Sequence, residues 1–189
     1  AFDHWQTFRP TSCGRAVDRM EIRIDSPDPF KQVGEILTKG MNVMDGYYNN
    51  PKASNTVLSP DGWLHTGDLG VLDPDGYLYI KGRSKSLILG PSGQNIYPEE
   101  IEDLLNAQPY IAESLVIERE GKLVALVYPD AEAMKQNKIS CETLLKIIHE
   151  TRKQINQQIP AYSQIARIEI HDEEFEKTPK RSIKRFLYQ

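Results

Sequence analysis

Two clusters of turn-forming residues constrain the fold of this chain more than any other feature. Residues 61–70 read Asp-Gly-Trp-Leu-His-Thr-Gly-Asp-Leu-Gly, and residues 73–76 read Asp-Pro-Asp-Gly. The second cluster separates two apolar segments, a pattern that predicts a β-hairpin. We expect the hairpin to place Asp68, in a glycine-flanked turn, beside Arg83 at the end of the second strand.

This pair of side chains has the chemistry of half a nucleotide site. A carboxylate with little around it can accept hydrogen bonds from both vicinal hydroxyls of a ribose. An arginine at the end of the neighbouring strand can reach the same sugar or a phosphate. A turn-capping role for Asp68 and a surface ion pair for Arg83 are the alternatives.

Composition indicates an ordinary soluble globular protein. The chain has 189 residues, of which 26% are charged and 39% hydrophobic, and its net charge of -4 gives no bias toward DNA or membrane. Cys13 and Cys141 lie far apart and fit neither a disulfide nor a metal site, so we expect a cytoplasmic protein.

Targeting and metal-binding patterns are not found in the sequence. No apolar run approaches the roughly 18 residues of a membrane span, although peripheral membrane contact stays possible. The histidines have no metal-ligand spacing, so no metal-binding residue is predicted. Because the sequence opens with Ala1 rather than Met, we expect it to be a piece of a larger protein.

The pattern of apolar residues predicts an α+β fold in two parts. Before Gly82, alternation at 17–24 and a glycine-bounded segment at 34–40 predict an antiparallel, β-barrel-like subdomain, with a bulge in the first strand. Asn49-Asn50-Pro51 is predicted to be one of its loops.

After Arg83 the pattern becomes that of a small α+β domain. Helices are predicted from Pro98 and from Ser140, the second ending at Pro160, with a hairpin around Glu120-Gly121 and a last strand at 165–170. The inner face of the second helix is predicted to consist of Leu144, Leu145, Ile148, Ile155 and Ile159.

Motifs in a fixed order resemble the adenylate-forming superfamily, which includes acyl-CoA synthetases, firefly luciferase and the adenylation domains of peptide synthetases. The end of the chain, Lys177 to Arg185, is most similar to the long-chain fatty acid–CoA ligases. The motifs are Gly34-Glu35-Ile36, Gly46 to Pro51, Trp63 to Asp68, Gly82 to Ile88, and Asn95 to Glu102.

The resemblance implies that residues 1–83 are the last, barrel-like subdomain of a large N-terminal adenylation domain, and that residues 84–189 are its mobile C-terminal α+β domain. The implied reaction converts fatty acid, ATP and CoA to acyl-CoA, AMP and pyrophosphate through acyl-AMP. The family's phosphate loop and Mg²⁺-binding acidic motif are not in this sequence, so both are expected upstream. The fragment alone is therefore expected to be inactive.

The resemblance also assigns site residues. Asp68 and Arg83 correspond to ribose contacts, and Lys85 to the hinge at which the small domain rotates. Gly93 lies in the loop that the family uses during thioester formation, where a glycine lets backbone approach a ligand closely.

The catalytic lysine of the family is replaced in this chain. Ser182 occupies its position, and a serine cannot supply positive charge to the α-phosphate. We therefore assign the role to Lys180, which could reach inward if the segment is a loop. A solvated basic terminus is the alternative.

Three other functions stay open at this point. The enzyme could pass its acyl group to an acyl carrier protein instead of CoA, or the loss of lysine at Ser182 could mark a non-catalytic nucleotide-binding or regulatory homologue. Nucleic-acid binding is the least favoured, because the single basic run 177–185 gives no stacking platform.

Overall fold

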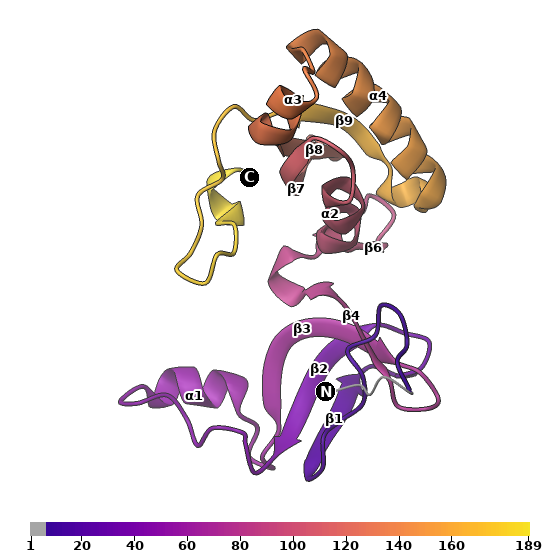
Figure 1. Ribbon diagram of the computed structural model, residues 1–189. Coiled ribbons are helices and arrows are strands. Elements are labelled where there is room, and N and C mark those ends of the chain that lie inside the picture. The colour runs from indigo at the N-terminus through magenta and orange to yellow at the C-terminus, as the bar shows by residue number, and fades with distance from the viewer. Residues whose placement is uncertain (1–6) are drawn as a thin grey trace. The chain divides into compact units, whose positions relative to one another are not determined.

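A computed structural model describes residues 7–189. Backbone contacts divide the chain into two compact units that separate after Lys85. The first unit contains β1 to β4, and the second contains the remaining strands and the longer helices (Figure 1).

The first unit is built on an antiparallel sheet with the strand order β1-β2-β3-β4. The predicted antiparallel sheet is thus confirmed, and among the described residues it stays open rather than closing into a barrel. Its elements are β1 (Met20–Asp25), β2 (Gly34–Gly40), α1 (Pro51–Val57), β3 (Leu64–Leu72) and β4 (Leu78–Arg83).

The hairpin between β3 and β4 is confirmed. Leu72 pairs with Leu78, and the Gly76 N–H donates to the Asp73 carbonyl at 2.9 Å, which closes the turn. Leu78 also packs with Ile24 and Ile36 in the small core on one face of the sheet.

The structure corrects two local predictions in this unit. The first strand begins at Met20 without a bulge, because Arg19 has a φ of 63° and the Met20 N–H donates to the Val17 carbonyl at 3.1 Å, which forms a turn. The predicted loop Asn49-Asn50-Pro51 is non-helical at its first two residues, but Pro51 is already the first residue of helix α1. The Asn50 side chain accepts the Ala53 N–H at 3.0 Å, so the Asn-Pro pair starts a helix here.

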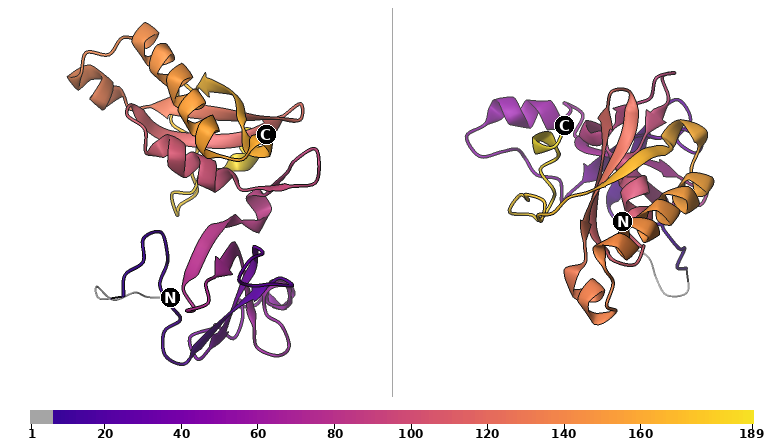
Figure 2. Two further views of the ribbon diagram at one scale, coloured as in Figure 1. Left: turned by 90° about the vertical axis from the view of Figure 1, so that its right-hand side faces the viewer. Right: turned by 90° about the horizontal axis from the view of Figure 1, so that it is seen from above.

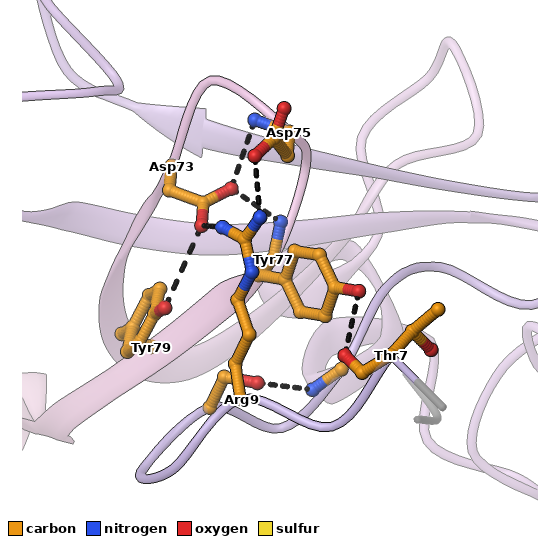
Figure 3. A network of polar contacts seen from close by, with 8 residues as sticks. Thr7, Arg9, Asp73, Asp75, Tyr77 and Tyr79 are labelled. Carbon is orange, nitrogen blue, oxygen red and sulfur yellow. Dashed lines mark hydrogen bonds and ion pairs between the residues drawn. The ribbon is translucent and has the colours of Figure 1, made fainter. Parts of the chain in front are cut away.

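Arg9 ties the segment before β1 to the β3–β4 hairpin (Figure 3). Its guanidinium forms ion pairs with Asp73 and Asp75 and lies 4.2 Å from the centre of the Tyr77 ring. The Tyr77 hydroxyl donates to the Thr7 carbonyl at 2.8 Å. These contacts hold the chain against the turn that precedes β4.

Backbone hydrogen bonds extend this attachment along the outer edge of β4. The Cys13 N–H donates to the Leu78 carbonyl at 2.8 Å, and the Leu78 N–H donates to the Gly14 carbonyl at 2.9 Å. The attached segment therefore pairs the backbone groups of Leu78, which would otherwise be open at the start of this sheet edge.

The second unit is a three-stranded sheet with α2 and α4 packed on one face (Figure 2). Strand β8 lies in the centre, antiparallel to β7 and parallel to β9. The elements are β5 (Ile88–Leu89), β6 (Asn95–Ile96), α2 (Pro98–Asn106), β7 (Ile111–Arg119), β8 (Lys122–Pro129), α3 (Ala131–Gln136), α4 (Cys141–Gln158) and β9 (Ile165–Ile170).

The structure confirms both predicted helices. Pro98 begins α2, and the Ser140 hydroxyl caps α4 by accepting the Thr143 N–H at 3.2 Å. The predicted inner face of α4 is wrong at Leu145, which is 56% exposed, and Thr151 is buried instead. Helix α3 was not predicted.

None of the helices described between residues 7 and 189 combines the length and the apolar character needed to cross a membrane.

The C-terminal segment covers the other face of the sheet. Phe175 is buried there against Leu115 and Val124, and Ile183 and Tyr188 pack at the margin of the same cluster. The rings of Phe175 and Tyr188 meet edge to face with centres 5.2 Å apart. The segment after β9 is thus part of the domain core.

Arg185 fixes this segment through a largely buried ion pair. Its Nη2 lies 2.5 Å from Glu102 Oε2, and its Nη1 donates to the Val116 carbonyl at 3.2 Å. Glu102 Oε1 accepts the Val116 N–H at 2.6 Å. Burial raises the pKa of Glu102, although the charge of Arg185 and the Val116 N–H oppose the rise. Glu102 and Arg185 thus provide hydrogen-bond partners for the N–H and the carbonyl of Val116, two backbone groups that do not pair with β8.

Replacing Asp73 is expected to change how the stability of the first unit depends on pH. Burial alone would raise the Asp73 pKa, but the Tyr77 N–H, the Arg9 charge and the Asp75 N–H together lower it. A lowered pKa in the folded state gives stabilisation that is present above the unfolded pKa and is lost as pH falls through the folded value. The stability difference between wild type and Asp73→Asn should therefore shrink below about pH 4.

Urea unfolding between about pH 7 and about pH 3, followed by tryptophan fluorescence, measures this difference, since both tryptophans precede Lys85. Arg9→Met should reduce the same pH dependence. A difference between wild type and Asp73→Asn that grows toward acid would contradict the assignment.

Arg185→Met is expected to destabilise the second unit by about 3 kcal/mol, because it leaves the Glu102 carboxyl buried without its partner. Adding Glu102→Gln should recover part of the loss by removing the unpaired charge. Amide hydrogen exchange in β8 measures both effects. A loss below about 0.5 kcal/mol in the single variant would show that the pair does not hold the segment.

Candidate functional site

Asp68 lies in a pronounced bulge of β3. Between Glu35 and Leu37, the partner position on β3 moves from Leu69 to His65. Residues 66–68 therefore lie opposite a single residue of β2. The predicted turn is thus a bulge inside a strand, where local twist re-aims side chains away from the ladder.

Side chains bond to the backbone groups that the bulge removes from the ladder. Thr66 Oγ1 donates to the Ile36 carbonyl at 2.7 Å and accepts the Asp68 N–H at 3.1 Å. Glu35 Oε1 accepts the Gly67 N–H at 2.9 Å. Gly67 has a φ of 73°, a conformation that glycine adopts without strain. The bulge therefore has its own set of hydrogen bonds.

Behind the bulge, the second oxygen of Glu35 contacts a histidine. Glu35 Oε2 lies 2.9 Å from His65 Nδ1, and His65 Nε2 lies 3.0 Å from Ser59 Oγ. Both ring nitrogens of His65 therefore have a polar partner within the first unit. Sequence reasoning assigned no role to Glu35. The one sequence feature that could have drawn attention to Glu35 is its place in Gly34-Glu35-Ile36, a motif that resembles the adenylate-forming superfamily.

The two predicted ribose contacts lie side by side. Asp68 and Arg83 are paired residues of β3 and β4, and Arg83 Nε lies 3.2 Å from Asp68 Oδ1. The Asp68 side chain is 34% exposed and that of Arg83 is 62% exposed. Both are therefore accessible to a ligand, and the carboxylate keeps acceptor capacity beyond the contact with arginine.

Lys85 and Gly93 lie in short connecting segments. Lys85 is exposed in the single 3₁₀ turn Ser84–Ser86. Gly93 lies in the turn between β5 and β6, with a φ of 81° and an N–H that donates to the Gly90 carbonyl at 2.9 Å. A Cβ at Gly93 would meet no heavy atom within 4 Å, so the backbone is open to approach.

A cavity of about 300 Å³ adjoins the β5–β6 turn within the second unit. Gly90, Pro91 and Ser92 of the turn line it, together with Leu123 of β8 and Tyr162.

Lys180 lies at the tip of a hairpin loop. The Thr178 N–H donates to the Ser182 carbonyl and the Arg181 N–H donates to the Thr178 carbonyl, each at 2.8 Å. Arg181 has a φ of 61°, which completes the tight turn. The segment is therefore a loop, the condition under which Lys180 could take the role of the missing lysine. Ser182 is exposed at the base of the loop.

The neighbouring lysines are held by carboxylates. Lys177 pairs with Glu113 at 2.5 Å and with Glu174, and Lys184 pairs with Glu176 at 3.0 Å. Hydrogen bonds to Glu113 and Glu174 raise the pKa of Lys177. These lysines fasten the loop, whereas Lys180 is exposed at its tip.

Within residues 7–189, no group of three or more histidine, cysteine or acidic side chains is arranged to hold a metal ion. Asp68 and Arg83 belong to the first unit, and Gly93 and Lys180 belong to the second.

Comparison with known proteins gives matches along most of the chain. Residues 85–188 match the family described as AMP-binding enzyme C-terminal domain. An indoleacetate–CoA ligase of Aromatoleum aromaticum is 45% identical over 124 residues, which cover 61% of this chain and 24% of that protein. A 2-succinylbenzoate–CoA ligase of Bacillus cereus strain AH820 is 38% identical over 143 residues, covering 74% of this chain and 29% of the relative.

Solved structures agree with these relatives. The O-succinylbenzoate–CoA synthetase of Bacillus subtilis, in complex with ATP and magnesium ion, superposes with a TM-score of 0.74 at 29% identity. The match covers 94% of this chain and 35% of that chain. Another structure of that synthetase, in complex with the acyl-adenylate intermediate OSB-AMP, is 30% identical with a TM-score of 0.74.

The matches span 24% of the indoleacetate–CoA ligase and 29% of the 2-succinylbenzoate–CoA ligase, so the chain covers less than a third of the length of either relative. The similarity to the synthetase structure extends over both units, because that match covers 94% of this chain. The chain belongs to the AMP-binding enzyme C-terminal domain family and corresponds to the C-terminal portion of an adenylate-forming enzyme.

Proposed function

We propose that this chain is the C-terminal part of an ATP-dependent acid–CoA ligase. The observation that carries the proposal is the β3 bulge, which presents the Asp68 carboxylate beside Arg83 on an accessible surface. The relatives named above are CoA ligases, and two solved neighbours contain ATP or an acyl-adenylate. A nucleotide ribose is thus the ligand that best suits the pair.

The proposed domain organisation follows from the same relatives. Residues 1–83 would be the last subdomain of a larger adenylation domain, and residues 84–189 would be its mobile C-terminal domain. The separation of the two units after Lys85 supports this division. Lys85, exposed in a one-turn segment, would absorb the backbone rotation, since a hinge needs few residues with solvated side chains.

In the proposed first half-reaction, a substrate carboxylate attacks the α-phosphate of ATP and pyrophosphate leaves, giving acyl-AMP. Asp68 would accept hydrogen bonds from the two ribose hydroxyls, and Arg83 would donate to the same sugar. Lys180 would place positive charge near the α-phosphate, where charge develops. Mg²⁺, whose ligands the resemblance places upstream of this sequence, would offset the negative charge of the phosphates.

In the proposed second half-reaction, the CoA thiol attacks the acyl carbonyl and AMP leaves. The Gly93 turn would lie against the pantetheine arm, because its backbone is open to close approach. A long-chain fatty acid as the acyl donor and a cytoplasmic location stay predictions from the sequence.

The acyl acceptor distinguishes a CoA ligase from the first alternative, an acyl-AMP ligase that passes its acyl group to a carrier protein. Intact enzyme would be supplied with fatty acid, ATP and either CoA or a phosphopantetheinylated carrier protein. Thioester formed with the carrier alone would assign the chain to an acyl-AMP ligase.

Asp68→Ala is expected to lower kcat/KM for ATP about 100-fold in the intact enzyme, because two hydrogen bonds to a charged acceptor are lost. The measurement is ATP–pyrophosphate exchange driven by the acid substrate. Asp61→Ala, which replaces the exposed aspartate at the start of segment 61–70, is the matched control and should behave as wild type. Equal kinetics in the two variants would rule out a ribose contact by Asp68.

Lys180→Ala is expected to slow pyrophosphate exchange about 100-fold, since it removes a charge that stabilises the transition state. Ser182→Lys in the same background should restore exchange, because it returns lysine to the family position. Lys135→Ala, an exposed lysine of α3, is the control.

Undiminished exchange in Lys180→Ala would assign the loop a structural role only. No exchange in the wild-type enzyme would instead favour a non-catalytic nucleotide-binding homologue, the alternative that Ser182 raises.

A further inference from the structure

Glu35 lies directly behind the bulge that carries Asp68. Each of its two carboxylate oxygens has a different partner, the Gly67 N–H at 2.9 Å and His65 Nδ1 at 2.9 Å. The Glu35 side chain is 27% exposed, so these bonds are partly shielded from water.

The Gly67 N–H needs this acceptor because the bulge takes it out of the β2–β3 ladder. Gly67 immediately precedes Asp68, so its backbone conformation sets the direction in which the Asp68 carboxylate points. A glycine has wide conformational freedom, and the nearest atom to a Cβ at Gly67 would be Arg83 Nη2 at 3.9 Å. Local packing therefore leaves room for Gly67 to move, and its hydrogen bond to Glu35 restricts that movement.

Glu35 is itself held in place from several directions. It lies in the inner strand β2, paired with Asp25 of β1 on one side and with Leu69 of β3 on the other. His65, whose second ring nitrogen lies 3.0 Å from Ser59 Oγ, orients the carboxylate. The acceptor offered to Gly67 is thus fixed by a rigid strand and a second hydrogen bond, the arrangement that keeps a binding group in one geometry.

We propose that Glu35 is a positioning residue for ribose recognition, acting through the Gly67 amide to aim the Asp68 carboxylate at the two hydroxyls. This inference rests on the proposed function. It adds that Glu35 controls the discrimination between a ribonucleotide and a 2′-deoxyribonucleotide, since only a correctly aimed carboxylate contacts both hydroxyls.

Substitutions of Glu35 separate this role from a general loss of charge. Glu35→Gln keeps a carbonyl oxygen for the Gly67 N–H, and His65 can change tautomer so that Nδ1 accepts from the new amide while Nε2–H donates to Ser59. Glu35→Leu has nearly the same size and offers no acceptor. The glutamine variant should therefore resemble wild type, and the leucine variant should lose the positioning.

The activity readout is the ratio of kcat/KM for ATP to that for 2′-deoxy-ATP in pyrophosphate exchange by the intact enzyme. Loss of one well-aimed hydrogen bond corresponds to about a tenfold fall in this ratio for Glu35→Leu. Glu35→Gln should stay within about twofold of wild type. In an Asp68→Asn background, Glu35→Leu should cause no further change in the ratio, because interacting residues are not additive.

A second readout needs no catalysis. Hydrogen exchange of the Gly67 amide, measured on the 189-residue chain, should become faster in Glu35→Leu and stay slow in Glu35→Gln. The Ile24 amide, in the β1 strand, is the internal control for unfolding of the whole sheet.

An unchanged nucleotide ratio in Glu35→Leu, with exchange activity present, would overturn the positioning role and leave the proposed function intact. Equal effects of Glu35→Leu in the wild-type and Asp68→Asn backgrounds would also overturn it, because they would indicate general damage. Absence of pyrophosphate exchange in the wild-type enzyme would overturn the proposed function first, and this role with it.

Discussion

The accessible position of Asp68 depends on hydrogen bonds between side chains and the backbone of the β3 bulge. A regular ladder would pair residues 66–68 with successive residues of β2, whereas here they lie opposite one residue. The Glu35 carboxylate and the Thr66 hydroxyl accept hydrogen bonds from the N–H groups of residues 67 and 68, which the bulge removes from the ladder. Without such partners, those amides would be costly to withdraw from water. The bulge is therefore a stable feature that can hold a carboxylate beside Arg83.

In the second unit, the comparable constraint is the attachment of the chain end to the sheet. Phe175 is buried in the second face of the sheet, and Arg185 forms its ion pair with Glu102 at the edge of β7. The loop that carries Lys180 lies between these two anchors in the sequence. Lys180 is thus presented from a fixed base, and this distinguishes it from a lysine in a solvated tail.

The residues of the proposed ligase are divided between the two units. Asp68 and Arg83 would bind the sugar from the first unit, and Lys180 and Gly93 would act on the phosphate and the thiol from the second. In each unit, these residues are positioned by hydrogen bonds to other residues of the same unit. A change at Lys85 could therefore alter the relation between the units without altering either set of contacts.

The sequence by itself determined the elements whose signals are local. The Asp73–Gly76 turn, the proline start of α2 and the serine cap of α4 each depend on chemistry within a few residues, and all were predicted. The motif order also indicated the family, and the resemblance assigned Asp68 and Arg83 to the same ribose, whereas their direct pairing is a finding of the structure. Only the tertiary structure revealed the bulge, the role of Glu35 and the anchoring of Arg185. These depend on partners about 30 and 83 positions away, which no local pattern encodes.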